Sequence, residues 1–255
     1  HILLLVVYPI WLVVLLPFML VQRVPIFVFL LHVQLEPIVL VKLFESVANR
    51  PISVRWVDVN KGDDVVPDIR SRLVARQIRG ANEDPLFAPT PPLESLRNIL
   101  SYAATDIEGE APKCRDPKSP KRIQISLIDI SRAYFSAKVS DDHPVYVELP
   151  PEDPDFGTDL CGRLNVHMYG TRPAADGWHC EYSGTMTNAG FGVGQSSACL
   201  FRHTGKNLLC SVHGDDFTTV GSKRDLDWCK TELEKKYELK EGARLGPGLS
   251  DDKEG

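Results

Sequence analysis

The chain has 255 residues, of which 43% are hydrophobic and 25% charged, so it is long and apolar enough to bury a substantial core. Its net charge of −5 argues against a uniformly basic surface of the kind that binds nucleic acids through their phosphates. Six cysteines occur at irregular spacings without a CxxC pair, which argues against a zinc-finger-type site and fits a reducing, intracellular compartment. Cys199 and His203 form at most half of a metal site.

The N-terminal stretch differs from the rest of the chain. Residues 2–21 are all apolar or proline, enough to cross a hydrocarbon core of roughly 30 Å as a helix. Prolines at positions 9, 17 and 25 oppose this interpretation, because each costs a helix interior about 3 kcal/mol. Two interpretations of residues 1–44 therefore stay open: a membrane segment, or a foreign stretch such as a gene-model artefact.

The pattern of residues 54–78 predicts a hairpin whose second strand is basic. Residues 54–59 alternate as a strand does, residues 60–64 supply a turn, and residues 69–78 return as a second strand. Residues 69–80 carry four arginines without an acid, and residues 113–122 carry five basic side chains against one acid. Both segments are interpreted either as solvated faces or as local phosphate-binding surfaces in an acidic chain.

A proline-rich loop at 85–92 precedes a predicted amphipathic helix at 94–104, and an apolar strand follows at 123–131. Ile123, Ile125, Leu127 and Asp129 share one face of this strand by the two-residue period. A carboxylate that ends an apolar stripe must be paired, solvated or bound to a metal ion.

A second hairpin is predicted from Leu208 to Val220, with Gly214 at its turn and Asp215 and Asp216 directly after it. Ser222 then caps an amphipathic helix. The residues expected to face inward are Leu226, Cys229, Leu233 and Tyr237.

Two apolar strands thus each deliver carboxylates at one end. Clustered carboxylates repel one another unless a cation neutralises them, and hard divalent ions accept such oxygen ligands. Two metal ions about 4 Å apart stabilise both the attacking and the leaving oxygen of a phosphoryl transfer. The pattern therefore indicates nucleotidyl-transfer chemistry.

Motifs in the same order along the chain resemble those of the reverse transcriptases of copia-type LTR retrotransposons. Upstream motifs are RWVDVNKGDD, RSRLVARQ and PLFAPTPPLESLRNIL. The later motifs are LIDISRAYFSAKV at 127–139, HPVYVELPPEDPD at 143–155, CGRLNVHMYGTRPAADGWHCEY at 161–182, GFGVGQSSACLFRH at 190–203 and SVHGDDFTTVG at 211–221. The last takes the place of the family's YVDD hairpin.

The resemblance implies an α+β fold, the palm and fingers of a right-hand polymerase. Residues 45–122 would be fingers-like, and residues 123–255 would form an antiparallel palm sheet with flanking helices, with the thumb largely missing. Asp129, Asp215 and Asp216 would be catalytic and would bind metal. The nucleotide-binding residues would be Tyr134 as a steric gate, Arg70, Arg72 and Arg76 on the triphosphate, and Gly170 and Arg172 near template and nucleotide. Ordinary packing for Tyr134 and a plain turn for Gly170 stay open as alternatives.

The implied activity is that of an RNA-directed DNA polymerase with two Mg²⁺ ions, Mn²⁺ being an alternative. Its partners would be an RNA or DNA template with its primer, deoxynucleoside triphosphates, and the integrase and RNase H domains of a longer Pol polyprotein. The protein would be intracellular, in the cytoplasm or a virus-like particle, and membrane-bound only if residues 1–44 form a genuine segment.

Departures from the family pattern leave two alternatives. His213 and Gly214 replace the usual Tyr-Val, Pro173 replaces Gln, and Asp176 brings an acid into a region expected to approach phosphates. A catalytically inactive, retrotransposon-derived fragment is one alternative. A membrane-tethered binding protein anchored by residues 1–44 is the other.

Overall fold

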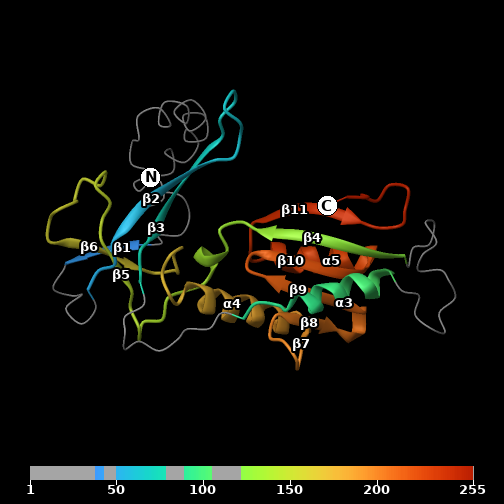
Figure 1. Cartoon of the computed structure of the whole chain (residues 1–255). Coiled ribbons are helices and arrows are strands. Elements are labelled where there is room, and N and C mark those ends of the chain that lie inside the picture. The colour runs from blue at the N-terminus through green and yellow to red at the C-terminus, as the bar shows by residue number, and fades with distance from the viewer. Residues whose placement is uncertain (1–37, 43–49, 79–88, 105–121, 255) are drawn as a thin grey trace, which may run out of the picture. The chain divides into compact units, whose positions relative to one another are not determined.

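The computed structural model describes residues 38–42, 50–78, 89–104 and 122–254 (Figure 1). The chain forms two compact units, one of residues 1–78 with 139–171 and one of residues 79–138 with 172–255. The predicted boundaries at residues 44 and 122 stay predictions.

The second unit is built on a six-stranded antiparallel sheet, which agrees with the predicted mixture of helices and antiparallel strands. Its strand order is β11-β4-β10-β9-β8-β7. The strands are β4 (Ile123–Ile130), β7 (Gly192–Val193), β8 (Leu200–His203), β9 (Leu208–His213), β10 (Asp216–Ser222) and β11 (Leu239–Leu245). The predicted strand at 123–131 and the predicted hairpin at 208–220 are therefore confirmed.

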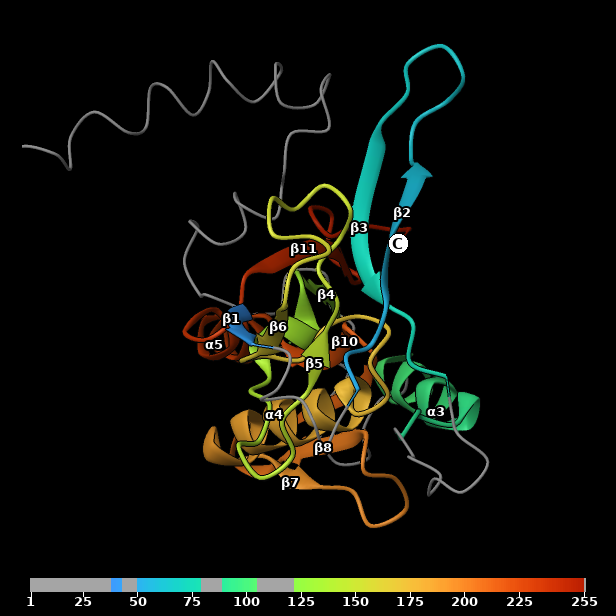
Figure 2. The same cartoon turned by 90° about the vertical axis from the view of Figure 1, so that its left-hand side faces the viewer.

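Helices cover both faces of this sheet. Helices α4 (Ala174–Asn188) and α5 (Lys223–Glu234) pack on one face, and α3 (Leu93–Ala104) lies on the other, against β4, β9 and β10 (Figures 1 and 2). The predicted helix at 94–104 is confirmed. The predicted cap of α5 is confirmed as well, because the Ser222 side chain accepts a hydrogen bond from the Asp225 amide.

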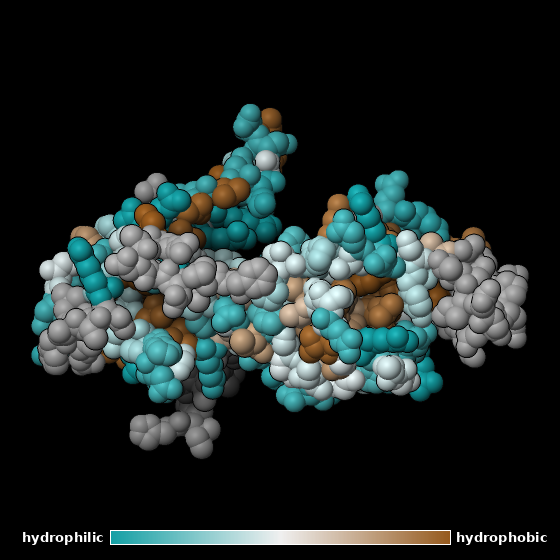
Figure 3. Space-filling model, turned by 60° about the horizontal axis from the view of Figure 1, so that its bottom comes forward, coloured by the Kyte–Doolittle hydropathy of each residue, from teal (hydrophilic) through white to brown (hydrophobic). Residues whose placement is uncertain are grey.

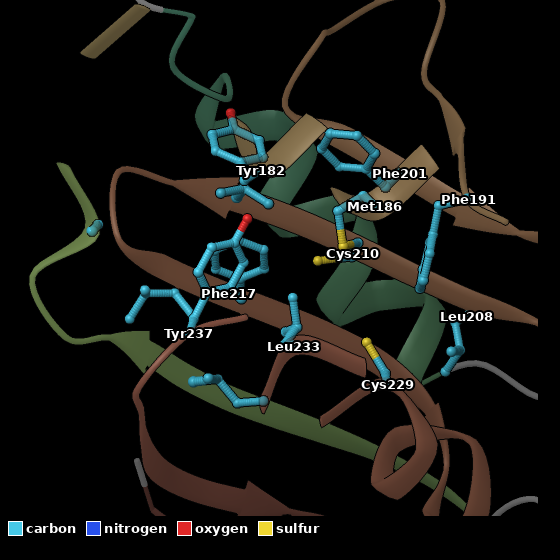
Figure 4. Close-up of a cluster of buried hydrophobic side chains, with 14 of the residues drawn as sticks. Tyr182, Met186, Phe191, Phe201, Leu208, Cys210, Phe217, Cys229, Leu233 and Tyr237 are labelled. Carbon is cyan, nitrogen blue, oxygen red and sulfur yellow. The ribbon is translucent and has the colours of Figure 1, made fainter. Parts of the chain in front are cut away.

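The main core lies between the sheet and helices α4 and α5 (Figure 4). Trp178, Tyr182 and Met186 recur every four residues along α4, so one stripe of that helix faces β9 and β10. Edge-to-face contacts join Tyr182 to Phe217, with ring centroids 5.8 Å apart, and Trp178 to Tyr237, at 5.2 Å. Cys210 and Cys229 are buried in this core, as their apolar surroundings in the sequence predict.

The first unit contains a long hairpin of β2 (Val54–Asn60) and β3 (Ile69–Ala75), as predicted. Apolar side chains stand among hydrophilic ones along this hairpin (Figure 3). A second sheet in this unit has the order β1-β6-β5, formed by β1 (Ile38–Lys42), β5 (Tyr146–Val147) and β6 (Leu160–Leu164).

Strand β1 belongs to the stretch 1–44, whose residues 1–37 and 43–44 lie outside the described residues. The prediction of a membrane segment or foreign stretch there stays a prediction. Across the residues that the structure does describe, no helix has the length and apolarity needed to span a bilayer.

Gly170 fixes a turn of the first unit to the end of β3. The Ala75 amide donates to the Tyr169 carbonyl at 2.8 Å, and the Gln77 amide donates to the Gly170 carbonyl at 3.2 Å. Gly170 has φ +85°, and a Cβ on it would lie 2.0 Å from the Ala75 carbonyl oxygen. A side chain is therefore excluded both by the backbone conformation and by space.

Gly170→Ala should lower the free energy of unfolding of the first unit by roughly 3 kcal/mol, from the strained backbone and the overlap with Ala75. Hydrogen exchange of the Ala75 and Gln77 amides, together with urea unfolding, would measure the loss. Gly157→Ala is the matched control, because Gly157 has φ +78° but open space around its Cβ position. Equal effects of the two substitutions would show that the contact with Ala75 contributes nothing.

Candidate active site

The three acidic residues singled out from the sequence lie at one end of the second unit's sheet. Strands β4 and β10 pair so that Asp129 is directly opposite Asp216. Asp215 precedes Asp216 in the β9–β10 turn, and its carbonyl accepts a hydrogen bond from the Ile130 amide at 2.9 Å. Because opposed residues of an antiparallel pair share a face, Asp129 and Asp216 point away from the core that contains Ile128 and Phe217.

The glycine that departs from the family pattern suits this turn. Gly214 has φ +64°, a left-handed conformation that glycine adopts without steric cost. Its Cβ position meets no atom within 4 Å, so the turn is open on that side.

Burial and neighbouring charges both act on Asp216. Partial burial raises the pKa of Asp216 above its ordinary value, and the nearby charges of Asp215 and Asp129 raise it further, whereas His213 lowers it. The three carboxylates therefore act on one another, and a positive charge among them would be stabilised.

Lys240 supplies a positive charge to this cluster. It lies on β11 opposite Asp129, and its Nζ is 3.5 Å from the Asp129 carboxylate. Sequence reasoning missed this residue, since β11 carries too little periodic apolar pattern to be recognised as a neighbour of β4. The ion pair is half-exposed, so its net stabilisation is small, at most about 1 kcal/mol.

The three aspartates offer the type of ligand that a hard divalent cation prefers. Mg²⁺ and Mn²⁺ prefer oxygen ligands, and Asp129, Asp215 and Asp216 together offer six carboxylate oxygens whose mutual repulsion such an ion would relieve. These are the residues that could hold a metal at this end of the sheet.

Trp178, which the sequence did not reveal as a site residue, holds the β9–β10 turn with Gly214 and Asp215, which we call the acidic turn, from the side of the main core. The Trp178 indole N–H donates to the Gly214 carbonyl at 2.8 Å, and the side chain is only 2% exposed. This bond ties the first turns of α4 to the residue that precedes Asp215. The signal in the sequence was the four-residue spacing of Trp178, Tyr182 and Met186, which marks an inward helical stripe.

Tyr134 lies near the acidic cluster. It belongs to a short 3₁₀ turn, Ala133–Ser136, which follows Arg132 in a left-handed conformation (φ 55°). Partial burial, and then the Asp215 charge, raise the pKa of the Tyr134 phenol. The side chain also packs against the main core. The position of Tyr134 is therefore compatible both with ordinary packing and with a role beside Asp215.

The remaining candidate residues divide between the two units. Arg70, Arg72, Arg76 and Gly170 belong to the first unit, and Arg172 is half-buried in the second. Within the first unit, the Arg72 guanidinium lies 6.0 Å from the centre of the Tyr169 ring, and Arg70 forms an exposed ion pair with Asp68 at 3.5 Å. Arg72 thus lies near Tyr169, the residue before Gly170 in the turn that holds the end of β3.

Comparison with known proteins gives two matches. The family model described as reverse transcriptase (RNA-dependent DNA polymerase) matches residues 38–248. A retrovirus-related Pol polyprotein from the transposon TNT 1-94 of Nicotiana tabacum is 26% identical over 214 residues. That match covers 78% of this chain but 14% of the relative, so the chain spans about one seventh of the relative's length. Both matches confirm the resemblance to copia-type retrotransposon sequences.

Trp178→Phe should loosen the acidic turn while it keeps most of the buried aromatic surface. The loss of this part-buried hydrogen bond costs about 1 kcal/mol, and we expect faster hydrogen exchange at the amides of residues 214–216. Tyr182→Phe is the control on the same helix, because it removes only a 3.8 Å contact with the Cys199 sulfur. If exchange at residues 214–216 were unchanged in Trp178→Phe, Trp178 would have no role in holding the turn.

Proposed function

The chain belongs to the reverse transcriptase (RNA-dependent DNA polymerase) family, and on this basis we propose that it catalyses template-directed nucleotidyl transfer from deoxynucleoside triphosphates to a primer. The observation that carries the proposal is the pairing of Asp129 with Asp216 across β4 and β10, with Asp215 in the adjoining turn. This arrangement places acidic side chains at one end of β4 and β10, on the face of the sheet that points away from the main core.

In this proposal Asp129, Asp215 and Asp216 hold two Mg²⁺ ions, for which Mn²⁺ can substitute. When bound, the ions lower the pKa of the primer 3′-hydroxyl and neutralise charge on the triphosphate. Lys240 balances the charge of Asp129 in the absence of the ions, and Trp178 keeps the turn of Asp215 in place. The protein's own part is to position these groups before the substrate arrives.

We assign the substrate contacts to the predicted residues of both units. Tyr134 would lie under the nucleotide sugar and exclude a 2′-hydroxyl, an assignment supported by its proximity to Asp215. Arg70, Arg72 and Arg76 would hold the triphosphate, and Gly170 and Arg172 would contact template and nucleotide. The exposure of the arginines on the hairpin supports their part, since a phosphate can reach them.

The proposed architecture is that of palm and fingers. The six-stranded sheet with α4 and α5 would form the palm, and the β2–β3 hairpin would belong to the fingers. The template–primer and the remaining domains of a Pol polyprotein, integrase and RNase H, would be its partners. The described cysteines are free thiols, which supports a location in the cytoplasm or in virus-like particles.

The alternative of an inactive, retrotransposon-derived domain rests on the departures from the family pattern. Two of them fit the fold without difficulty. Pro173 precedes the first residue of α4, a position where proline costs a helix little, and Gly214 occupies a left-handed turn. Asp176 is exposed on α4 and remains the departure that favours the alternative.

Primer extension on an RNA template by the full chain tests the proposal. With Mg²⁺ or Mn²⁺ present, we expect extension with deoxynucleotides, and Asp215→Asn should reduce the rate by about 10²–10³-fold, because a charge that stabilises the transition state is lost. Asp142→Asn, at an exposed aspartate in a loop of the first unit, is the matched control and should leave the rate unchanged. Extension by wild type that survives in Asp215→Asn would contradict the assignment, and no extension by a folded wild type would favour the inactive domain.

The same assay tests Tyr134. If its ring excludes the 2′-hydroxyl, Tyr134→Ala should incorporate ribonucleotides at least tenfold more readily relative to deoxynucleotides. An unchanged preference would leave Tyr134 as a packing residue of the 3₁₀ turn.

A further inference from the structure

A second group of potential metal ligands lies on α4, separate from the three aspartates. Asp176, His179 and Cys180 each offer one ligand atom, and these atoms all lie within 4.8 Å of one another. Their spacing of three and four residues places them on one face of the helix. Asp176 and Cys180 are exposed and His179 is half-buried, so a solvent ion can reach the group.

The orientation of His179 gives independent support. Its Nε2 lies 3.5 Å from the Ala198 carbonyl oxygen and 3.3 Å from the Ser183 hydroxyl oxygen. A carbonyl only accepts hydrogen bonds, so the tautomer with its proton on Nε2 satisfies this contact, and that tautomer leaves the Nδ1 lone pair available to a metal. Metal-bound histidines are usually held in this way, through a hydrogen bond from the second ring nitrogen.

The imidazole ring is also fixed by packing. It meets the Tyr182 ring edge-to-face, with centroids 5.2 Å apart and the planes at 89°. Tyr182 is itself 3% exposed in the main core, so His179 is held against a rigid neighbour. The His179 side chain would therefore lose little conformational entropy when an ion binds.

The chemistry of the three ligands selects the class of ion. A thiolate and an imidazole prefer Zn²⁺ and similar transition ions, whereas Mg²⁺ prefers oxygen ligands alone. Ligand atoms around a tetrahedral Zn²⁺ lie roughly 3.5 Å apart, so small side-chain rotations would bring these three atoms to that distance. We propose that Asp176, His179 and Cys180 bind a Zn²⁺-type ion, with water as the fourth ligand.

An ion here would fix the part of α4 that supports the acidic turn. Trp178 lies between Asp176 and His179 in the sequence, and its indole donates to the Gly214 carbonyl at 2.8 Å. The ion would also neutralise Asp176, the exposed acid that departs from the family pattern. The proposal does not depend on polymerase activity, since it rests on the geometry of α4 alone.

Cobalt substitution in the full chain tests the site. With excess Mg²⁺ to fill sites of oxygen ligands alone, one equivalent of Co²⁺ should give a sulfur-to-cobalt charge-transfer absorption that Zn²⁺ abolishes. Cys180→Ser should remove this absorption, and His179→Ala and Asp176→Asn should weaken Co²⁺ binding at least tenfold. His143→Ala, an exposed histidine in a loop of the first unit, is the matched control and should bind Co²⁺ as wild type does.

Alkylation of the wild-type chain gives a second measurement that needs no variant. Among the cysteines that the structure describes, Cys180 is exposed and the others are buried. Zn²⁺ should slow the alkylation of Cys180, located by peptide mass mapping, at least tenfold. A charge-transfer absorption that persists in Cys180→Ser, or an alkylation rate at Cys180 that Zn²⁺ leaves unchanged, would overturn the proposal.

Discussion

The register between β4 and β10 places two carboxylates opposite each other, and much of the second unit serves to hold that arrangement. Like charges on directly opposed residues destabilise a sheet. Partial burial raises the pKa of Asp216, and the charges of Asp215 and Asp129 raise it further. A shift of the register by one residue would separate the two carboxylates, but it would turn the apolar face of one strand, with Phe217 or Ile128, out of the core. Apolar packing on one face thus keeps the carboxylates close together on the other, and the proposed cations would relieve their repulsion.

The core behind the strands also determines where the acidic turn lies. Trp178 connects α4 to Gly214, and its ring packs against Tyr182 and Tyr237, so the turn is held through an aromatic cluster rather than by its own short backbone. A polymerase requires positioned ligands before substrate binds, since rearrangement during the reaction would raise the barrier. In the proposed function, the indole hydrogen bond, the Ile130 amide bond to the Asp215 carbonyl and the weak Lys240 ion pair hold this end of the sheet.

Local pattern sufficed to predict the elements that carry the acids, but not their surroundings. The alternation in 123–131 and the turn at Gly214 identified both strands correctly. The predicted apolar stripe of Ile125, Leu127 and Asp129 is only partly buried, and the alternate residues from Gln124 to Ile130 are the buried ones. Ile128 and Ile130 on that face belong to the main core. Burial of Gln124 could not be predicted at all, since it depends on a hydrogen bond to Asp251, 127 residues away.

Long-range pairing explains the other residues that the sequence concealed. Lys240 reaches Asp129 only because β11 joins the edge of the sheet. Cys199 and His203, whose spacing predicts at most half of a metal site, make other contacts. The Cys199 sulfur contacts the Pro89 carbonyl and the Tyr182 hydroxyl, and the His203 ring accepts a hydrogen bond from the Lys206 amide. The spacing of Asp176, His179 and Cys180 on one helix, in contrast, brings potential ligand atoms within 4.8 Å of one another.

Binding of Mn²⁺ to the full chain tests the central claim most directly, that opposed strands gather Asp129, Asp215 and Asp216 into a cation site. Electron paramagnetic resonance would follow the titration, with Zn²⁺ present to occupy ligands of the thiol and imidazole type. The account predicts that Asp129→Asn and Asp216→Asn each weaken Mn²⁺ binding at least tenfold, although the two residues lie on different strands. Wild-type affinity in both variants would show that the carboxylates share no cation, and the account would be wrong.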